Sequence, residues 1–279
     1  MMTEEEQDLL ELKESEKDEI TKRAAISAVI VHESIRKEGE DELSRHPAAL
    51  WWSGLAAGLS MGLSLLGKAL ITAYMPTLAV WSPLVTNFGY TIGFLVVILG
   101  RQQLFTENTL TAVLPLFQKR SLSYVLPVMR LWIVVLAANL VGIFLFALII
   151  WGTDVFGQEI NAVFLLIGEE SLRLGFWTTL IKGILAGWLI ALMVWLLPAA
   201  ETARVVIIII ITYLVGLGGF SHIIAGSTEI FYVILAGNTS LGESILRFFI
   251  PTLIGNILGG VVLVAALNHA QAMAGTRKT

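Results

Sequence analysis

The sequence predicts an all-α membrane protein with six transmembrane helices, an inverted repeat of three plus three in which the second and fifth helices are broken. Of the 279 residues, 56% are hydrophobic and only 14% are charged, whereas an ordinary soluble domain has about 25% charged residues. Six segments contain the roughly 20 apolar residues that a spanning helix needs, and two of them are interrupted. This composition excludes a soluble enzyme, and the net charge of −4 argues against nucleic acid as a partner.

The amino-terminal segment differs from the rest of the chain. Residues 1–48 carry 21 of the 40 charged side chains, and Met1–Ile20 is acidic. Apolar residues then recur at helical spacing, which predicts an amphipathic helix over Thr21–Arg45, lying against the inner membrane face or a neighbouring subunit. His46-Pro47 ends this helix. We therefore divide the chain into an acidic cytoplasmic segment (1–45), a six-span transmembrane domain (46–269) and a cytoplasmic tail (270–279).

The six spans are expected at Ala49–Tyr74, Pro83–Phe117, Leu126–Trp151, Leu174–Leu197, Val205–Ala236 and Ile245–Leu267. Their orientation follows from lysine and arginine, which concentrate in cytoplasmic loops. Thirteen of these residues fall on one side, whereas the opposite loops carry only Arg173 and Arg247. Both termini are therefore predicted to be cytoplasmic, in a multi-pass protein of the cell's inner (plasma) membrane.

The second and fifth segments are too long for simple spanning helices. The second has 35 residues, and a straight helix of that length would run about 52 Å, well beyond the hydrocarbon thickness. Polar and glycine-rich stretches interrupt the two segments at 100–108 and 216–222. Broken backbone at membrane depth persists only where protein or a water-filled cavity satisfies it, so the two breaks are expected to meet and form the site. The alternative is a pair of long, kinked helices with no pathway.

Two residues in these breaks carry the most informative chemistry. His222 is the one histidine of four that falls inside a span, and an ionisable residue there is a candidate functional group. Thr106 lies in the opposite break, where its hydroxyl both donates and accepts hydrogen bonds. The structural alternatives are a neutral histidine bound to a backbone carbonyl and a threonine that caps a half-helix.

Four further charged residues lie within the spans, and buried charges need partners. We expect Arg101 to pair with Glu107 by proximity and Lys182 with Glu229 by depth. These groups act either as structural ion pairs or in attracting anions. Lys68, near the end of the first span, is expected to extend its amine to the membrane surface.

Several motifs together resemble the formate/nitrite transporter family. They are Leu-Phe-Thr at 104–106, Gly-Phe-Ser-His at 219–222, Asn-Leu-Val-Gly at 139–142 and the stretch from Ile250 to Gly260. The resemblance covers roughly residues 46–269, and the segments around 56–62 and 101–109 are similar to the YfdC-like branch. Membership implies an aquaporin-like protomer with its own pore, assembled as a homopentamer in lipid.

The resemblance also implies roles for individual residues. Thr106 matches the family's pore threonine, with Leu104 and Phe105 in the same motif, and His222 matches its central histidine. The apolar residues that constrict the pore match Tyr90, Phe94 and Val215.

The chain departs from the family pattern at several positions. Gln103 and Ser221 replace acidic residues, and Gly187 and Gly226 replace pore asparagines. The family's vestibule lysine has no clear counterpart, although Lys182 or Arg173 is a possible substitute.

These features together predict a channel or proton-linked transporter for small monovalent weak-acid anions, formate first and nitrite or similar anions next. Protonation is expected near His222. Because no metal-ligand cluster, cofactor motif or nucleophile–base pair stands out, we expect neither an enzyme nor a cofactor. One alternative is an aquaporin-like pore for a small neutral solute, which Gly187 and Gly226 would widen. Another is a non-conducting assembly protein whose acidic amino-terminal segment holds cytoplasmic partners.

Overall fold

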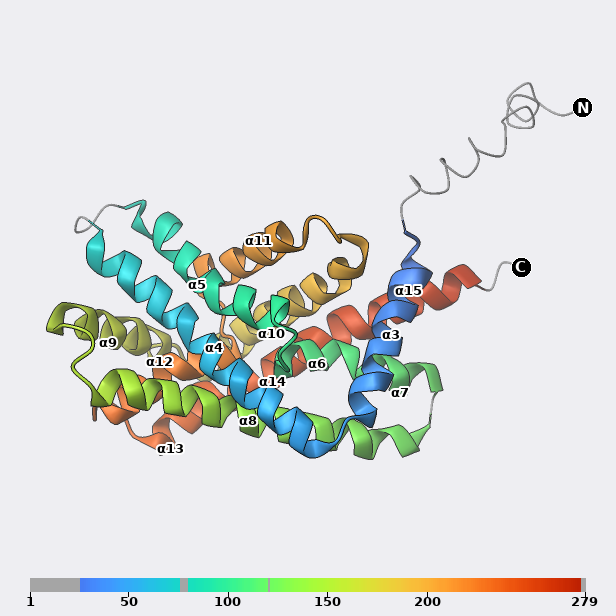
Figure 1. The fold of residues 1–279 in the computed structure, drawn as a ribbon, viewed down its shortest axis with the longest axis horizontal. Helices are drawn as coiled ribbons and strands as arrows, with labels where there is room; N and C mark the ends of the chain where they lie inside the picture. Colours follow the sequence, from blue (N-terminus) through green and yellow to red (C-terminus); the bar gives the residue numbers. More distant parts are fainter. Residues whose placement is uncertain (1–25, 76–79, 120, 277–279) are drawn as a thin grey trace, which may run out of the picture.

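The computed structural model describes residues 26–75, 80–119 and 121–276, and within these ranges the chain is helical, with no strand (Figure 1). Five helical stretches are long and apolar enough to cross a membrane: Pro47–Tyr74, Ser82–Leu99, Leu122–Gly152, Phe176–Ala199 and Leu241–Ala274. The apolar helices α11 (Arg204–Leu217) and α12 (Ile223–Leu235) are shorter. The prediction of an all-α membrane protein is confirmed.

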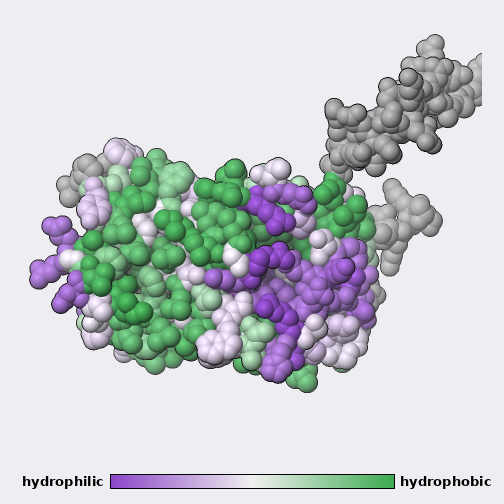
Figure 2. All heavy atoms as spheres, in the orientation of Figure 1, coloured by the Kyte–Doolittle hydropathy of each residue, from purple (hydrophilic) through white to green (hydrophobic). Residues whose placement is uncertain are grey.

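The named helices of the long stretches are α4 (Pro47–Tyr74), α5 (Ser82–Leu99), α8 (Val125–Gly152), α10 (Phe176–Leu196), α13 (Leu241–Ser244), α14 (Ile250–Leu258) and α15 (Leu267–Thr276). Single-turn elements adjoin them at Leu122–Tyr124 and Leu197–Ala199, and π-helical turns lie at Ile245–Phe249 and Gly259–Ala266. Figure 2 shows an apolar surface over the left and centre of the molecule, with hydrophilic residues gathered at the right-hand end around α3 and at the far left. This distribution suits a lipid-facing belt between two wetted ends.

Both expected interruptions are present, and each is shorter than the sequence suggested. The first separates α5 from α6 (Phe105–Thr111), which is followed by α7 (Val113–Lys119). The second separates α11 from α12. Thr106–Asn108 and Gly216–Leu217, predicted to lie within the breaks, are helical.

One asparagine holds each break. Asn139 of α8 donates from Nδ2 to the carbonyls of Gly54 and Gln103 at 2.8 and 2.9 Å, and its Oδ1 accepts from the Phe105 N–H at 2.9 Å. The bonds to Gln103 and Phe105 satisfy backbone groups that a broken helix leaves unpaired in the membrane, and the bond to Gly54 ties the break to α4.

Asn256 of α14 makes the same three kinds of bond at the second break. It donates to the carbonyls of Gly183 and Ser221 at 2.8 and 2.9 Å and accepts from the Ile223 N–H at 2.8 Å. Left-handed residues also occupy equivalent places, Arg101 with φ 54° in the first break and Gly219 with φ 56° in the second. The two halves therefore share one local design.

The helix α3 (Ala28–Ser44) is shorter than the predicted Thr21–Arg45. It begins after Ser27, whose hydroxyl accepts from the Ile30 N–H, and His46-Pro47 ends it and starts α4 as expected. Residues 1–25, including the acidic Met1–Ile20, lie outside the described residues. The sequence placed α3 on the membrane face or a neighbouring subunit, but it packs on its own chain, against α6, α7 and α15.

Two other segments differ from expectation. The connection between the third and fourth spans contains a 15-residue helix, α9 (Gln158–Leu172), which packs on α4 and α12. The predicted tail from residue 270 is helical through Thr276, because α15 continues the last span.

A histidine pair joins α3 to α15, and we expect this contact to weaken at acidic pH. The fully buried His32 makes a 2.9 Å hydrogen bond between its Nε2 and Nδ1 of His269. Burial lowers the pKa of His32 below the usual value, although Glu33 opposes the shift. Because the folded-state pKa is lowered, this stabilisation is present above the ordinary histidine pKa of about 6.5 and is lost as pH falls below it.

Hydrogen exchange of α3 amides, corrected for intrinsic rates, tests this expectation. Protection should fall between about pH 7.5 and pH 5.5. His32→Phe should remove the pH dependence, whereas the exposed His46→Gln should keep it. Equal protection of wild-type α3 at both pH values would refute the prediction.

Candidate functional site

The structure brings together the two residues that the sequence singled out in the separate breaks. Thr106 is the second residue of α6, and His222 is the last residue before α12. Their side chains, 0% and 1% exposed, approach with Thr106 Oγ1 at 2.9 Å from His222 Nε2. The breaks therefore meet at a buried polar contact.

The hydrogen bonds of His222 define its tautomer. Nδ1 accepts from the Ala225 N–H at 3.1 Å, so the ring caps α12. A neutral imidazole that accepts at Nδ1 carries its proton on Nε2, which then donates to Thr106 Oγ1. The Thr106 hydroxyl keeps its own proton for another acceptor. A proton on His222 Nδ1 would point toward the Ala225 N–H. The two N–H groups would repel each other, and the cap of α12 would be lost.

Aromatic residues of α5 wall this contact. The ring centroid of Phe94 lies 5.0 Å from that of His222 at an interplanar angle of 73°, and Tyr90 follows at 5.5 Å from Phe94. Both aromatic side chains are buried, as is Val215 of α11. Three of the predicted constriction residues thus surround or approach the Thr106–His222 contact.

A cavity of about 490 Å³ reaches His222 from the end of the molecule that contains α9. Tyr90, Val215 and Gly226 are among its lining residues. Four charged side chains also line this α9-side cavity, namely Lys68, Glu170, Lys182 and Glu229. Lys68 therefore faces the cavity, which corrects the expectation that its amine only extends to the membrane surface.

The predicted pairing of Lys182 with Glu229 is wrong. Lys182 Nζ donates to the carbonyls of Gly218 and Gly219 at 3.3 and 3.1 Å, beyond the end of α11. This end of a helix carries partial negative charge, which a lysine complements. Glu229 instead accepts from Ser171 Oγ at 2.6 Å.

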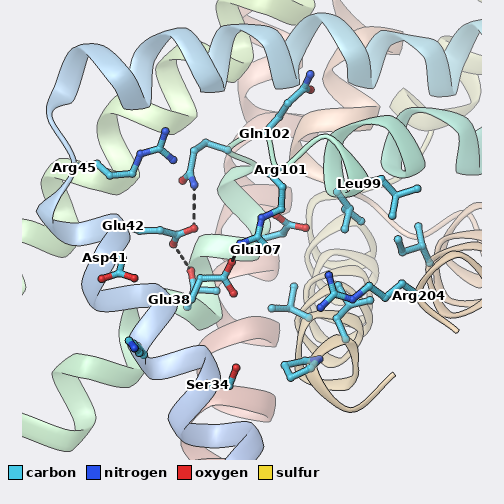
Figure 3. Close-up of a pocket in the computed structure, with 18 residues that line it drawn as sticks. Ser34, Glu38, Asp41, Glu42, Arg45, Leu99, Arg101, Gln102, Glu107 and Arg204 are labelled. Atoms are coloured by element: carbon cyan, nitrogen blue, oxygen red, sulfur yellow. Dashed lines mark hydrogen bonds and ion pairs between the residues drawn. The ribbon is translucent and has the colours of Figure 1, made fainter. Parts of the chain in front are cut away.

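A second cavity, of about 700 Å³, lies at the opposite end between α3 and the first break (Figure 3). Gln103 and Glu107 line this α3-side cavity. The predicted pairing of Arg101 with Glu107 is wrong, because Arg101 lies 3.3 Å from a Glu38 carboxylate oxygen on α3.

Phe94, Leu104 and Thr106 adjoin lining residues of the two cavities: Leu104 follows Gln103 of the α3-side cavity, and Phe94 and Thr106 contact His222 of the α9-side cavity. All three are fully buried, and none of them lines either cavity. A path between the two ends would have to pass this apolar partition at the Thr106–His222 contact.

Two further candidates from the sequence, Phe105 and Gly187, make contacts that hold the fold together. Phe105 donates its N–H to Asn139 and packs its ring on Trp132. Gly187 lies at the contact of α10 with α14, where an added Cβ would stand 2.3 Å from the Asn256 carbonyl oxygen.

The last two candidates are Gly226 and Arg173. Gly226 does not widen the α9-side cavity, and Arg173 does not add its charge to that cavity. Gly226 lines the α9-side cavity, but the Phe248 ring fills the space beside it. Arg173 is exposed at the end of α9 and is absent from that cavity's lining.

Sequence reasoning gave no site role to Asn139 or Asn256. A usable signal existed, because both asparagines stand three residues before a glycine, in Asn-Leu-Val-Gly and Asn-Ile-Leu-Gly. Within the described ranges, no three histidine or acidic side chains gather as metal ligands would.

Comparison with known proteins assigns the chain to a family. The model of the formate/nitrite transporter family matches residues 29–270, most of the chain. This chain is a formate/nitrite transporter family member. The resemblance of the motifs in the two breaks is thereby confirmed.

Relatives within the family include channels and less defined proteins. The inner membrane protein YfdC of Escherichia coli (strain K12) is 45% identical over 244 residues, 88% of this chain and 78% of that protein. The formate channel BtFdhC of Bacillus thuringiensis is 26% identical over 241 residues, 84% of this chain and 91% of that one. The names of these two relatives, an inner membrane protein and a channel, are consistent with a membrane location for this formate/nitrite transporter family member.

Solved structures share its fold. A pentameric formate channel with formate bound superposes with a TM-score of 0.71 at 21% identity, covering 81% of this chain and 98% of that one. An FNT family ion channel reaches a TM-score of 0.75 at 20% identity, covering 86% and 98%. These likenesses show that the chain has the fold of these solved channels.

Proposed function

We propose that this chain is a channel for small monovalent weak acids, formate first, with one pore in each protomer of a homopentamer. The pore runs through six spans in an inverted three-plus-three arrangement, with both termini cytoplasmic. The formate channels among its relatives and structural neighbours support the substrate class, and the pentameric one supports the assembly. The matched asparagine contacts at the two breaks support the inverted repeat.

The observation that carries the proposal is the Thr106–His222 hydrogen bond between two cavities. One cavity reaches His222 and the other reaches Gln103, and apolar side chains close the space between them. Such a partition strongly disfavours a bare anion, because burial in low dielectric penalises charge. Within this partition, the Thr106 hydroxyl and the His222 imidazole can donate and accept hydrogen bonds.

The mechanism follows from these contacts. An anion enters the α9-side cavity, where Lys68 and Lys182 offset Glu170 and Glu229. Low dielectric near Phe94 raises the pKa of the entering acid, which takes a proton from water in the cavity. The neutral acid then crosses past Thr106 and His222, whose hydroxyl and imidazole satisfy its polar atoms in turn, and loses the proton in the α3-side cavity.

A flux assay on proteoliposomes tests the function directly. Stopped-flow light scattering would compare formate, nitrite, acetate and glycerol at two pH values. We expect faster formate uptake at the lower pH, with glycerol excluded. Glycerol uptake without acid transport would favour the neutral-solute pore.

Replacing His222 or Thr106 should slow formate flux at every pH. Thr106→Val removes the hydroxyl and His222→Asn replaces the ring with a shorter amide that lacks Nε2, so each variant loses the buried bond between the two residues, which corresponds to a loss of about tenfold. Because His222 rests as a neutral donor, the slope of flux against pH should persist in both variants. Thr228→Val, which changes a buried threonine on α12, is the control. A His222→Asn protein that keeps its flux but loses the pH slope would make His222 the proton donor and overturn this mechanism.

The neutral-solute pore has less support. Gly187 and Gly226 would widen such a pore, yet Gly187 lies at a helix contact and Phe248 occupies the space beside Gly226. The assembly role, which depends on a free amino-terminal segment, is also weakened because α3 packs on the transmembrane helices.

A further inference from the structure

The helix α3 carries a carboxyl group into the α3-side cavity. Glu42 Oε1 accepts from Gln103 Nε2 at 2.9 Å, and its Oε2 accepts from Thr111 Oγ1 at 2.7 Å. Figure 3 shows these bonds as two dashed lines from Glu42. One donor belongs to the first break and the other to the end of α6, so Glu42 touches the pathway residues themselves.

Glu42 differs from Glu33, Glu38 and Glu40 of α3, each of which makes an ion pair. Glu38 pairs with Arg101, and Glu40 pairs with Arg36 and Lys119. Glu42 has only the two neutral donors, and no ion pair of the described residues includes it. Its ionised form therefore adds an uncompensated negative charge to the cavity.

The charged groups facing it come from α3, the first break, α6 and α11. They are Lys37, Glu38, Asp41, Arg45, Arg101, Glu107 and Arg204. Three of these side chains are acidic and four are basic, so an ionised Glu42 brings their formal charges into balance and a neutral Glu42 leaves one excess positive charge.

We propose that Glu42 is a selectivity-determining residue of the pathway: its carboxylate controls how readily an anion occupies the mouth of the pore at the α3 end. This inference rests on the proposed function. It makes α3 part of the pore lining, and transport should not survive unchanged when residues 1–45 are deleted.

The pH at which this control operates lies above the ordinary carboxyl range. Burial raises the pKa of Glu42, and the charge of Glu38 adds to the shift, whereas the bonds from Gln103 and Thr111 and the charge of Arg45 oppose it. The carboxyl is therefore neutral at acidic pH. As the pH rises through its raised pKa, the carboxylate forms and repels anions from the mouth.

The local potential can be measured without transport, because the chain contains no cysteine. Ser34 lines the same cavity, so Ser34→Cys provides a single reactive thiol. The rate of its reaction with a sulfonate-bearing methanethiosulfonate is divided by the rate with an ammonium-bearing one. This ratio is measured over a pH series in wild-type, Glu42→Gln, Glu40→Gln and Thr111→Val backgrounds.

We expect Glu42→Gln to raise this ratio about threefold at alkaline pH and not at acidic pH, as removal of one charge at roughly 10 Å predicts. Glu40→Gln, on the same helix, should leave the ratio unchanged. Thr111→Val disturbs the docking contact but keeps the charge, so it should lack the alkaline rise. A Glu42→Gln ratio equal to that of Glu40→Gln at every pH would overturn the inference, as would an equal rise in Thr111→Val.

Formate flux at equal pH on both sides then links the potential to transport. The flux ratio of Glu42→Gln to wild type should be near one at acidic pH and about threefold at alkaline pH. A shifted thiol ratio without formate flux in wild type would refute the proposed function and leave the electrostatic role of Glu42 intact. Formate flux with a flat ratio would refute the role of Glu42 alone.

Discussion

Replacing Asn256 with leucine is expected to lower the free energy of unfolding by about 2–4 kcal/mol. The substitution keeps the side-chain volume similar but removes three hydrogen bonds at once. The Ile223 N–H and the Ser221 carbonyl would then lose their Asn256 partner where water is scarce, and the tie to the Gly183 carbonyl of α10 would also be lost. Because His222 lies between Ser221 and Ile223 in the chain, formate flux should fall as well.

Stability in detergent, followed as a melting temperature by loss of the monodisperse peak, measures this effect. Asn139→Leu should give a similar loss, since Asn139 makes the same contacts at the first break. Asn238→Leu is the matched control, because Asn238 is exposed and bonds only to Glu169. A melting temperature for Asn256→Leu as high as that of the control would mean that the break is held by other contacts.

Alanine at Gly58 or Gly187 is expected to be almost as damaging. A Cβ at Gly58 would stand 2.2 Å from the Asn139 carbonyl oxygen, and one at Gly187 would stand 2.3 Å from that of Asn256. These are backbone atoms, so the helices themselves must move apart. Such overpacking costs typically 1–3 kcal/mol and would also shift the two asparagines.

The same melting measurement applies, with Gly242→Ala as the control because nothing lies within 4 Å of its added Cβ. The Gly187 variant also separates two roles of that residue. A packing glycine predicts lower stability, whereas a pore-lining glycine predicts normal stability with reduced flux. A stable but slow Gly187→Ala protein would return Gly187 to the pathway.

Much of the fold was predictable because lipid imposes simple rules. The apolar runs and two overlong segments located the spans and the breaks, since only a helix satisfies its backbone in hydrocarbon. The helix α9 was missed because its 15 residues include five acidic or amide side chains in positions that suggested a loop. The boundaries of the breaks were too wide, because Thr106–Asn108 are polar yet helical.

The site was predictable in its centre and less so around it. Thr106 and His222 stood out because polar groups are rare at membrane depth. Their direct contact joins residues 116 apart, which no local pattern contains. The ion pairs were wrong because proximity and depth ignore competing partners: Glu38 from α3 reaches Arg101, and backbone carbonyls take Lys182.

The position of α3 constrains the order in which the chain can mature. This helix is synthesised first, yet its partners Gln103 and Thr111 follow it by 61 and 69 residues from Glu42, and His269 lies 237 residues beyond His32. The ribosome must therefore finish the last span before α3 finds all of its contacts. A nascent chain with a missing or misinserted last helix would leave α3 without its contact to His269, and proteases that cleave loose segments would reach this helix first. Seating of α3 thus marks a protomer as complete.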